Sequence, residues 1–197
     1  MCSCVTWLPA IHFIQLTMRI FDLIGTPSDW VVEHTPLIRN GGRVLDLACG
    51  YGRHAIWLAA QGYLVDAVDC NAQAVAGIHE IANINVILAD IERGEWPITE
   101  QKYDAIIVSR YLYRPILSML AQMLDIDGVL IYETFMIGNE RYGKPSNPDY
   151  LLLQDELYSV YAPLLKIHAF EQGEVKGTVP AVMQRICAVR THHHLGI

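Results

Sequence analysis

The stretch VLDLACGYGRH, residues 44–54, places an acid and two glycines where a ligand could bind. Asp46 lies in an apolar run, and Gly50 and Gly52 follow it at a turn where glycine lets the backbone approach a ligand closely. Read as G-x-G-x-x-A, the turn matches a relaxed dinucleotide fingerprint, in which a pyrophosphate lies on a helix N-terminus. A cofactor that carries an ammonium group would instead benefit from Asp46. Two cofactor classes therefore fit the turn.

Two further aspartates each follow an apolar run. Asp69 ends YLVDAVD, where a carboxylate can accept both hydroxyls of a ribose in either cofactor. Asp90 stands in ILADIE, where it can accept from the exocyclic amine of an adenine, while Ile91 and Tyr51 offer apolar surface to the ring. Three acids around a glycine turn suit an adenosine linked to an amino acid.

The elements that must position these residues alternate along the chain from residue 28. Helices are expected at 28–38, 53–62, 71–82, 115–124 and 153–165, and strands at 41–48, 63–69, 84–90, 103–109, 128–135, 166–175 and 181–191. Several strands are apolar at successive positions, as in a parallel sheet covered on both faces. A doubly wound α/β domain follows. The connection KGTVP is too short for a parallel crossover, so the last two strands either pair antiparallel or are not neighbours.

The composition of the chain favours some classes of protein and disfavours others. With 197 residues, 52% hydrophobic and 18% charged, the chain is long enough for one globular domain. The formal charge of −7 lacks the basic excess of a general nucleic-acid binder, so a nucleic-acid partner is disfavoured. The five cysteines form no CxxC pair and indicate neither a metal site nor disulfides, which favours the cytoplasm.

The ends of the chain are expected to differ from the domain. Residues 1–27 are an apolar segment, interrupted by polar residues and too short to span a bilayer, that packs on the domain or is partly disordered. The domain covers 28–191, and 192–197 form a tail. Met1 and Met18 are both candidate natural starts.

Several motifs together resemble class I S-adenosylmethionine-dependent methyltransferases. The stretch VLDLACGYGRHAIWLAAQGYLVDAVDCNAQAV resembles their motifs I and II, LADIE resembles motif III, and YDAIIVSRYLYRP and DGVLIYETF resemble the fourth and fifth strand motifs. Tellurite-resistance-type and related small-molecule methyltransferases are the most similar. The resemblance covers roughly residues 28 to 190. It implies a seven-stranded, mostly parallel sheet with an antiparallel last strand, S-adenosylmethionine as cofactor and S-adenosylhomocysteine as product.

The resemblance also implies a role for each residue near the turn. The methionine part of the cofactor would be held by Asp46, Ala48, Gly50 and Gly52, with Cys49 and Tyr51 in the same turn. The adenosine would be held by Asp69, Cys70, Asn71, Asp90 and Ile91, and Ser109, Arg110 and Tyr111 would stand between cofactor and acceptor. Arg53 either pairs with the methionine carboxylate or solvates the start of the helix.

The acceptor side is less constrained. The connection 132–152 is longer than usual and is expected to cover a small-molecule acceptor, with Glu133 and Tyr142 as binding groups. Arg110, Arg114, Arg141 and Lys144 can favour an anionic acceptor; the alternative is a solvated loop. The segment after the fourth strand lacks the N/D-P-P-Y/F motif of enzymes that methylate amino groups of bases or glutamine.

Two residues are candidate proton acceptors in catalysis. Tyr111 and His54 both lie beside the expected methyl position, although His54 is equally explained as a hydrogen-bonded histidine at a helix start. The rival functions are an NAD-dependent oxidoreductase and a non-catalytic protein that binds the cofactor. Either a monomer or a homodimer is compatible with the sequence.

Overall fold

The structure is a computed structural model that describes residues 25–93, 96–98, 101–175 and 179–192. The expected N-terminal segment lies outside these ranges except for residues 25–27, as do both candidate starts, and of the expected tail only residue 192 lies inside them. Among the described residues, no helix is long and apolar enough to cross a membrane.

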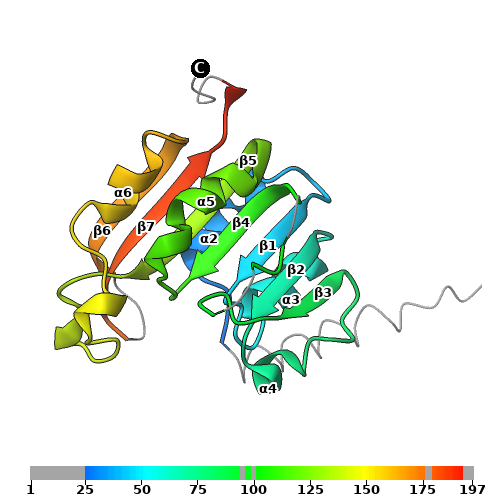
Figure 1. Cartoon of the computed structure of the whole chain (residues 1–197), viewed down its shortest axis with the longest axis horizontal. Coiled ribbons are helices and arrows are strands. Elements are labelled where there is room, and N and C mark those ends of the chain that lie inside the picture. The colour runs from blue at the N-terminus through cyan, green and yellow to red at the C-terminus, as the bar shows by residue number, and fades with distance from the viewer. Residues whose placement is uncertain (1–24, 94–95, 99–100, 176–178, 193–197) are drawn as a thin grey trace, which may run out of the picture.

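A seven-stranded sheet in the order β3-β2-β1-β4-β5-β7-β6 forms the centre of the molecule (Figure 1). Its strands are β1 (Arg43–Leu47), β2 (Leu64–Asp69), β3 (Ile84–Leu88), β4 (Tyr103–Ser109), β5 (Leu124–Phe135), β6 (Lys166–Val175) and β7 (Ala181–Val189). The first five strands pair in parallel, and β7 runs antiparallel to both β5 and β6. The doubly wound α/β fold and the reversed last strand are thereby confirmed.

Helices cover both faces of the sheet (Figure 1). One face packs on α2 (Asp29–His34), α3 (Arg53–Ala60) and α4 (Ala72–Val75), and the other packs on α5 (Leu117–Met123) and α6 (Glu156–Tyr161). Short 3-10 turns complete the chain at Thr35–Leu37, Arg114–Ile116, Asn139–Arg141 and Pro148–Tyr150. Because both faces are covered, the central strands are buried on successive residues, as their sequences predict.

Some helices are shorter than the sequence predicts. The side chain of Asn71 accepts from the backbone of Gln73 and Ala74 and begins α4. That helix ends at Val75 instead of continuing to residue 82, and i→i+3 bonds replace helical ones beyond it. Gly77 lies at this point, and glycine inside a helix is about 1 kcal/mol less favourable than alanine. The helix expected at 153–165 is likewise limited to α6.

Candidate functional site

The glycine turn joins β1 to α3 through residues in the left-handed region. Ala48, Gly50 and Gly52 have φ of 54°, 57° and 75°. The amide of Gly50 donates to Oδ2 of Asp69 at 2.7 Å, so the end of β2 holds the turn in place. Among the described residues, no heavy atom beyond Gly50 and its two chain neighbours lies within 4 Å of where a Cβ of Gly50 would stand, which leaves room for a ligand to approach the backbone.

Asp46 is a buried acid that binds the start of the helix after the turn. Its carboxylate is 1% exposed and accepts from the amide of Ala55, at the start of α3, at 2.9 Å. Burial raises its pKa to about 7, although the hydrogen bond from Ala55 and the charge of Arg53 oppose this shift. A nearby cationic ligand group would favour the ionised form. Asp46 is not among the residues that line the two cavities described next.

A cavity of about 300 Å³, which we call cavity A, opens beside the ends of β2 and β3. Its lining includes Asp69, Asp90 and Ile91, as the sequence predicts for an adenosine site, and Ala48, Cys70, Arg110 and Tyr111. The Asp69 carboxylate already accepts one backbone N–H on each oxygen, from Gly50 and Asn71, and each oxygen retains capacity for a further donor. The geometry therefore fits two ribose hydroxyls at Asp69.

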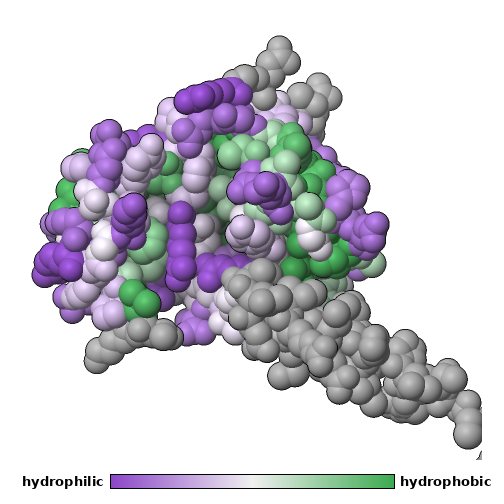
Figure 2. Space-filling view, turned by 90° about the horizontal axis from the view of Figure 1, so that it is seen from below, coloured by the Kyte–Doolittle hydropathy of each residue, from purple (hydrophilic) through white to green (hydrophobic). Residues whose placement is uncertain are grey.

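A second cavity of about 470 Å³, cavity B, lies between the end of β5, the beginning of β7 and the segment before α2. Its lining includes Arg53, Arg110, Glu133, Tyr142, Lys144 and Arg185. Arg110 lines both cavities, so they meet at the end of β4. Figure 2 views the molecule from below, the side toward which β1 and β4 point, and shows mainly hydrophilic side chains over its left and centre.

Arg110 has a backbone conformation that is uncommon for its residue type. Its φ is 58°, and its amide donates to the carbonyl of Glu133 at 2.9 Å. Within the described ranges, no side-chain hydrogen bond or ion pair engages its guanidinium. Strained backbone of this kind is often found at ligand sites. The residue thus places an unpaired cation where the cavities meet.

Three side chains form a chain of hydrogen bonds along cavity B. Arg53 Nη2 donates to Oγ of Ser109 at 2.9 Å, and Ser109 Oγ donates to Oε1 of Glu133 at 2.8 Å. Arg53 Nη1 also donates to the carbonyl of Thr26. Burial and the charge of Arg110 lower the pKa of Arg53. Arg53 is therefore fixed by protein groups on the side of cavity B.

The two candidate proton acceptors both lie in hydrogen bonds with the protein. His54 is 3% exposed, and its Nε2 accepts from the amide of Ser28 at 3.2 Å. Burial, together with Arg53 and Arg110, lowers the pKa of His54 to about 3. Its side chain lines neither cavity, which favours the alternative of a hydrogen-bonded histidine at a helix start.

Tyr111 lies at cavity A, where its hydroxyl donates to Oε1 of Glu92 at 3.0 Å. Burial and this hydrogen bond raise the pKa of the phenol. A phenol with a raised pKa holds its proton more firmly, so the surroundings of Tyr111 suit a hydrogen-bond donor better than a base.

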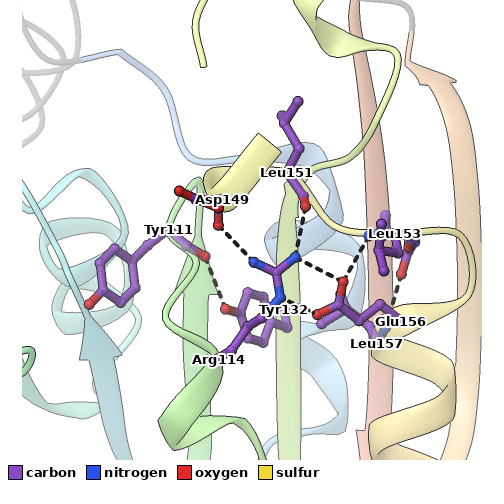
Figure 3. Close-up of polar contacts among 9 residues, drawn as sticks. Tyr111, Arg114, Tyr132, Asp149, Leu151, Leu153, Glu156 and Leu157 are labelled. Atoms are coloured by element: carbon purple, nitrogen blue, oxygen red, sulfur yellow. Dashed lines mark hydrogen bonds and ion pairs between the residues drawn. The ribbon is translucent and has the colours of Figure 1, made fainter. Parts of the chain in front are cut away.

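Arg114 binds groups of the protein between Asp149 and Glu156 (Figure 3). Its guanidinium pairs with Glu156 at 2.7 Å and donates to the carbonyls of Asp149 and Leu151. It lines neither cavity. These contacts tie the 3-10 turn before α5 to the end of the connection 136–152 and to α6.

The other residues of that connection lie at the edge of cavity B. Tyr142 and Lys144 line it, whereas Arg141 pairs with Glu174 at 3.5 Å and lies over the ring of Tyr142. The hydroxyl of Tyr142 donates to the same Glu174 carboxylate at 2.8 Å. The structure thus brings Glu133, Tyr142 and Lys144 together and leaves Arg114 apart.

The remaining turn residues differ in exposure. Cys49 is buried, and burial raises the pKa of its thiol, whereas Tyr51 is 61% exposed above the turn. Sequence reasoning missed Arg185, Met183 and Phe135 as residues that line cavity B. Only the register of the reversed strand, which sets Arg185 opposite Glu133, reveals Arg185, and no local motif signals that register.

Comparisons with known proteins agree with this architecture. The family model described as "Tellurite resistance protein TehB" matches residues 17–126, more than half of the chain. No curated protein matches the chain.

Solved structures with the same fold are distant in sequence. TehB from Haemophilus influenzae superposes with a TM-score of 0.72 at 19% identity, over 88% of this chain and 65% of that one. This chain therefore spans less than two thirds of the Haemophilus protein. A TehB-like S-adenosylmethionine-dependent methyltransferase from Corynebacterium glutamicum gives 0.63 at 16% identity, over 92% of this chain and 100% of that one. Magnesium protoporphyrin IX methyltransferase from Synechocystis, solved with S-adenosylmethionine bound, gives 0.58 at 19% identity, over 97% and 87%.

The fold is thus that of S-adenosylmethionine-dependent methyltransferases, and on the match of the family model the chain belongs to the tellurite resistance protein TehB family.

Proposed function

We propose that this chain is an S-adenosylmethionine-dependent methyltransferase that acts on a small molecule. The observation that carries the proposal is the meeting of two cavities at Arg110, one with the acids of an adenosine site and one with separate polar groups. When bound, the cofactor supplies a methyl group on a sulfonium, which is a good leaving group.

The residues present suit this cofactor. Asp69 would accept the ribose hydroxyls, and Asp90 and Ile91 would bind the adenine in cavity A. The open space at Gly50 would admit the methionine part, with the carboxylate of Asp46 beneath the turn. An NAD site has no need of a buried acid at that position.

The protein would promote transfer mainly by alignment, because holding two reactants in line can remove much of a bimolecular barrier. Cavity B would hold the acceptor. Its lining includes Arg53, Arg110, Lys144 and Arg185 against the acids Asp29 and Glu133, which supports an acceptor with a negatively charged group. Tellurite, after which the family is described, is one such candidate. Roles for Tyr111 and His54 in proton transfer, a cytoplasmic location and the monomeric or dimeric state stay predictions.

The decisive measurement is calorimetric and thermal-shift titration with S-adenosylhomocysteine and with NAD. At a ligand concentration of 100 times the dissociation constant, the free energy of unfolding should rise by about 2.7 kcal/mol with the first ligand and stay unchanged with the second. Stabilisation by NAD alone would support an oxidoreductase instead.

Transfer of a labelled methyl group to a panel of tellurite, thiols, amines and hydroxy acids then tests activity. Binding of S-adenosylhomocysteine without any transfer would support a non-catalytic, cofactor-binding protein.

A further inference from the structure

Glu133 is a buried carboxylate that faces the cavity proposed for the acceptor. It lies near the end of β5, is 4% exposed and lines cavity B. In the sheet it stands opposite Ser109 of β4 on one side and Arg185 of β7 on the other. Because directly paired residues point to the same face of a sheet, these three side chains form one row, and two of them, Glu133 and Arg185, line cavity B.

The hydrogen bonds in this row have a fixed direction. A guanidinium can only donate, so Ser109 Oγ accepts from Arg53 Nη2, and the hydroxyl donates its own hydrogen to Glu133 Oε1. Oε1 is therefore already engaged as an acceptor. No side chain or amide in the described part of the chain donates to Oε2.

The guanidinium opposite Glu133 forms its ion pair with a different carboxylate. Arg185 pairs with Glu171 at 3.0 Å and lies 5.2 Å from the centre of the Trp30 ring. Glu133 therefore keeps one carboxylate oxygen without a partner in the described part of the chain, on a side chain that lines cavity B. Such an oxygen can accept a hydrogen bond, or a proton, from a ligand.

The other walls of cavity B have different chemistry. Lys144 and Arg110 line it, and neither side chain has a hydrogen bond or ion pair within the described ranges. Phe135 and Met183 add apolar surface. A ligand that matches this arrangement has an anionic group, an apolar body and a group that donates a hydrogen.

We propose that Glu133 is the catalytic base, and that the acceptor is a small organic acid whose nucleophilic nitrogen, oxygen or sulfur carries a proton. In the step, the nucleophile's lone pair forms the new bond to the methyl carbon. The carbon–sulfur bond of the sulfonium breaks, and its electron pair stays on sulfur to give a neutral thioether. The nucleophile's proton passes to Oε2 of Glu133 and then to water. The assignment rests on the proposed function.

Binding to the complex with S-adenosylhomocysteine tests the assignment without turnover. The probes are para-aminobenzoate and para-hydroxybenzoate, which carry a donor, and benzoate, which does not. One added hydrogen bond of about 1 kcal/mol predicts roughly fivefold tighter binding of the donor-bearing probes by calorimetry. In Glu133→Gln, the Ser109 hydroxyl holds the amide oxygen and an NH₂ group faces the cavity, so this preference should disappear.

Turnover supplies the second readout. Glu133→Gln should lower kcat for the two donor-bearing probes by about 100-fold or more, and Glu133→Asp should recover part of it with a changed pH profile. Nicotinate has no proton to lose from its ring nitrogen, so Glu133→Gln should leave its kcat unchanged. Glu33→Gln, at an exposed position of α2, is the control for the change in charge.

The outcomes separate the two proposals. If S-adenosylhomocysteine fails to bind, the proposed function falls, and the role of Glu133 falls with it. If it binds but the donor-bearing probes bind no better than benzoate, or are never methylated, or are methylated equally by Glu133→Gln, the role of Glu133 is wrong and the proposed function stands.

Discussion

Asp46 and His54 are buried with pKa values displaced in opposite senses. Asp46 titrates near 7 in the folded protein against 3.8 ordinarily, so the folded state binds the extra proton and the free energy of unfolding falls as pH rises between these values. His54 titrates near 3 against 6.5, so the unfolded state binds the extra proton and the free energy of unfolding rises across that window. Each slope reaches at most about 1.4 kcal/mol per pH unit.

We therefore expect the two contributions to offset each other in the wild-type protein between about pH 4 and 6.5, and single variants to separate them. Asp46→Asn should become more stable as pH rises, and His54→Gln should become less stable. Urea unfolding across this range measures both curves, with Glu33→Gln as the control. Variant curves parallel to that of the wild type would show that the two groups do not titrate differently on folding.

At the level of single residues, the sequence predicts which residues line a cavity better than it predicts the hydrogen-bond partner of a given side chain. Asp69, Asp90 and Ile91 stand at cavity A because strand ends fix them locally. Nothing near His54 in the sequence indicates that its ring accepts from Ser28, 26 residues away, and nothing near Arg114 indicates Glu156, 42 residues away. Such contacts depend on how distant segments pack.

The turn between β1 and α3 offers a matched pair of glycines. Gly50→Ala places the new Cβ in open space, so only the left-handed backbone conformation destabilises the variant, by about 1–2 kcal/mol. The new methyl group would, however, occupy the space through which the ligand approaches the backbone. Gly52→Ala adds a Cβ at 2.7 Å from Cδ1 of Ile78. We expect Gly50→Ala to weaken binding of S-adenosylhomocysteine more than tenfold and to lower the free energy of unfolding by only about 1–2 kcal/mol.

For Gly52→Ala we expect a larger loss of stability, of about 2–4 kcal/mol, because strain and overpacking add. Ile78→Val should restore part of it by removing Cδ1. Calorimetry with S-adenosylhomocysteine and urea unfolding separate the two effects. Equal stability of the two glycine variants would contradict the role assigned to Ile78.

The connection after β5 depends on Arg114. Its bonds to Glu156 and to two carbonyls predict that Arg114→Met lowers the free energy of unfolding by about 1–3 kcal/mol and speeds proteolysis within residues 137–150. Arg39→Met, at a side chain that is 75% exposed and paired with Asp104, should lower it by less than about 1 kcal/mol. Unchanged stability, together with loss of acceptor binding in Arg114→Met, would instead support the original prediction of a substrate contact.

Across the whole molecule, the alternation of elements predicts the doubly wound α/β domain, because chain connectivity restricts which strands can pair. The short connection before β7 leaves the pairing of the last two strands open, and only the resemblance to methyltransferases implies the antiparallel last strand. Lengths of helices were predicted less well. Where α4 and α6 end depends on the weak preferences of single residues, and packing against the sheet easily overrides these.

The fold also separates stability from ligand binding at opposite ends of the sheet. At the amino ends of the strands, the buried carboxylate of Asp66 accepts from Arg43 at 2.9 Å, from Asn85 at 2.8 Å and from Tyr103 at 2.8 Å. These hydrogen bonds and the charge of Arg43 lower the pKa of Asp66, against the effect of its burial. The stability that they contribute is present above the ordinary pKa and is lost as pH falls through the lowered one.

Asp66→Asn removes the charge and retains the shape. It should lower the free energy of unfolding at neutral pH by about 2–4 kcal/mol, because Arg43 and Tyr103 lose a charged acceptor. The difference from the wild type should shrink in acid as the wild-type carboxyl is protonated. The dissociation constant of S-adenosylhomocysteine should stay unchanged, because both cavities lie at the carboxyl ends of the parallel strands. Weaker ligand binding by Asp66→Asn under conditions where the protein is fully folded would show that the two ends of the sheet are coupled.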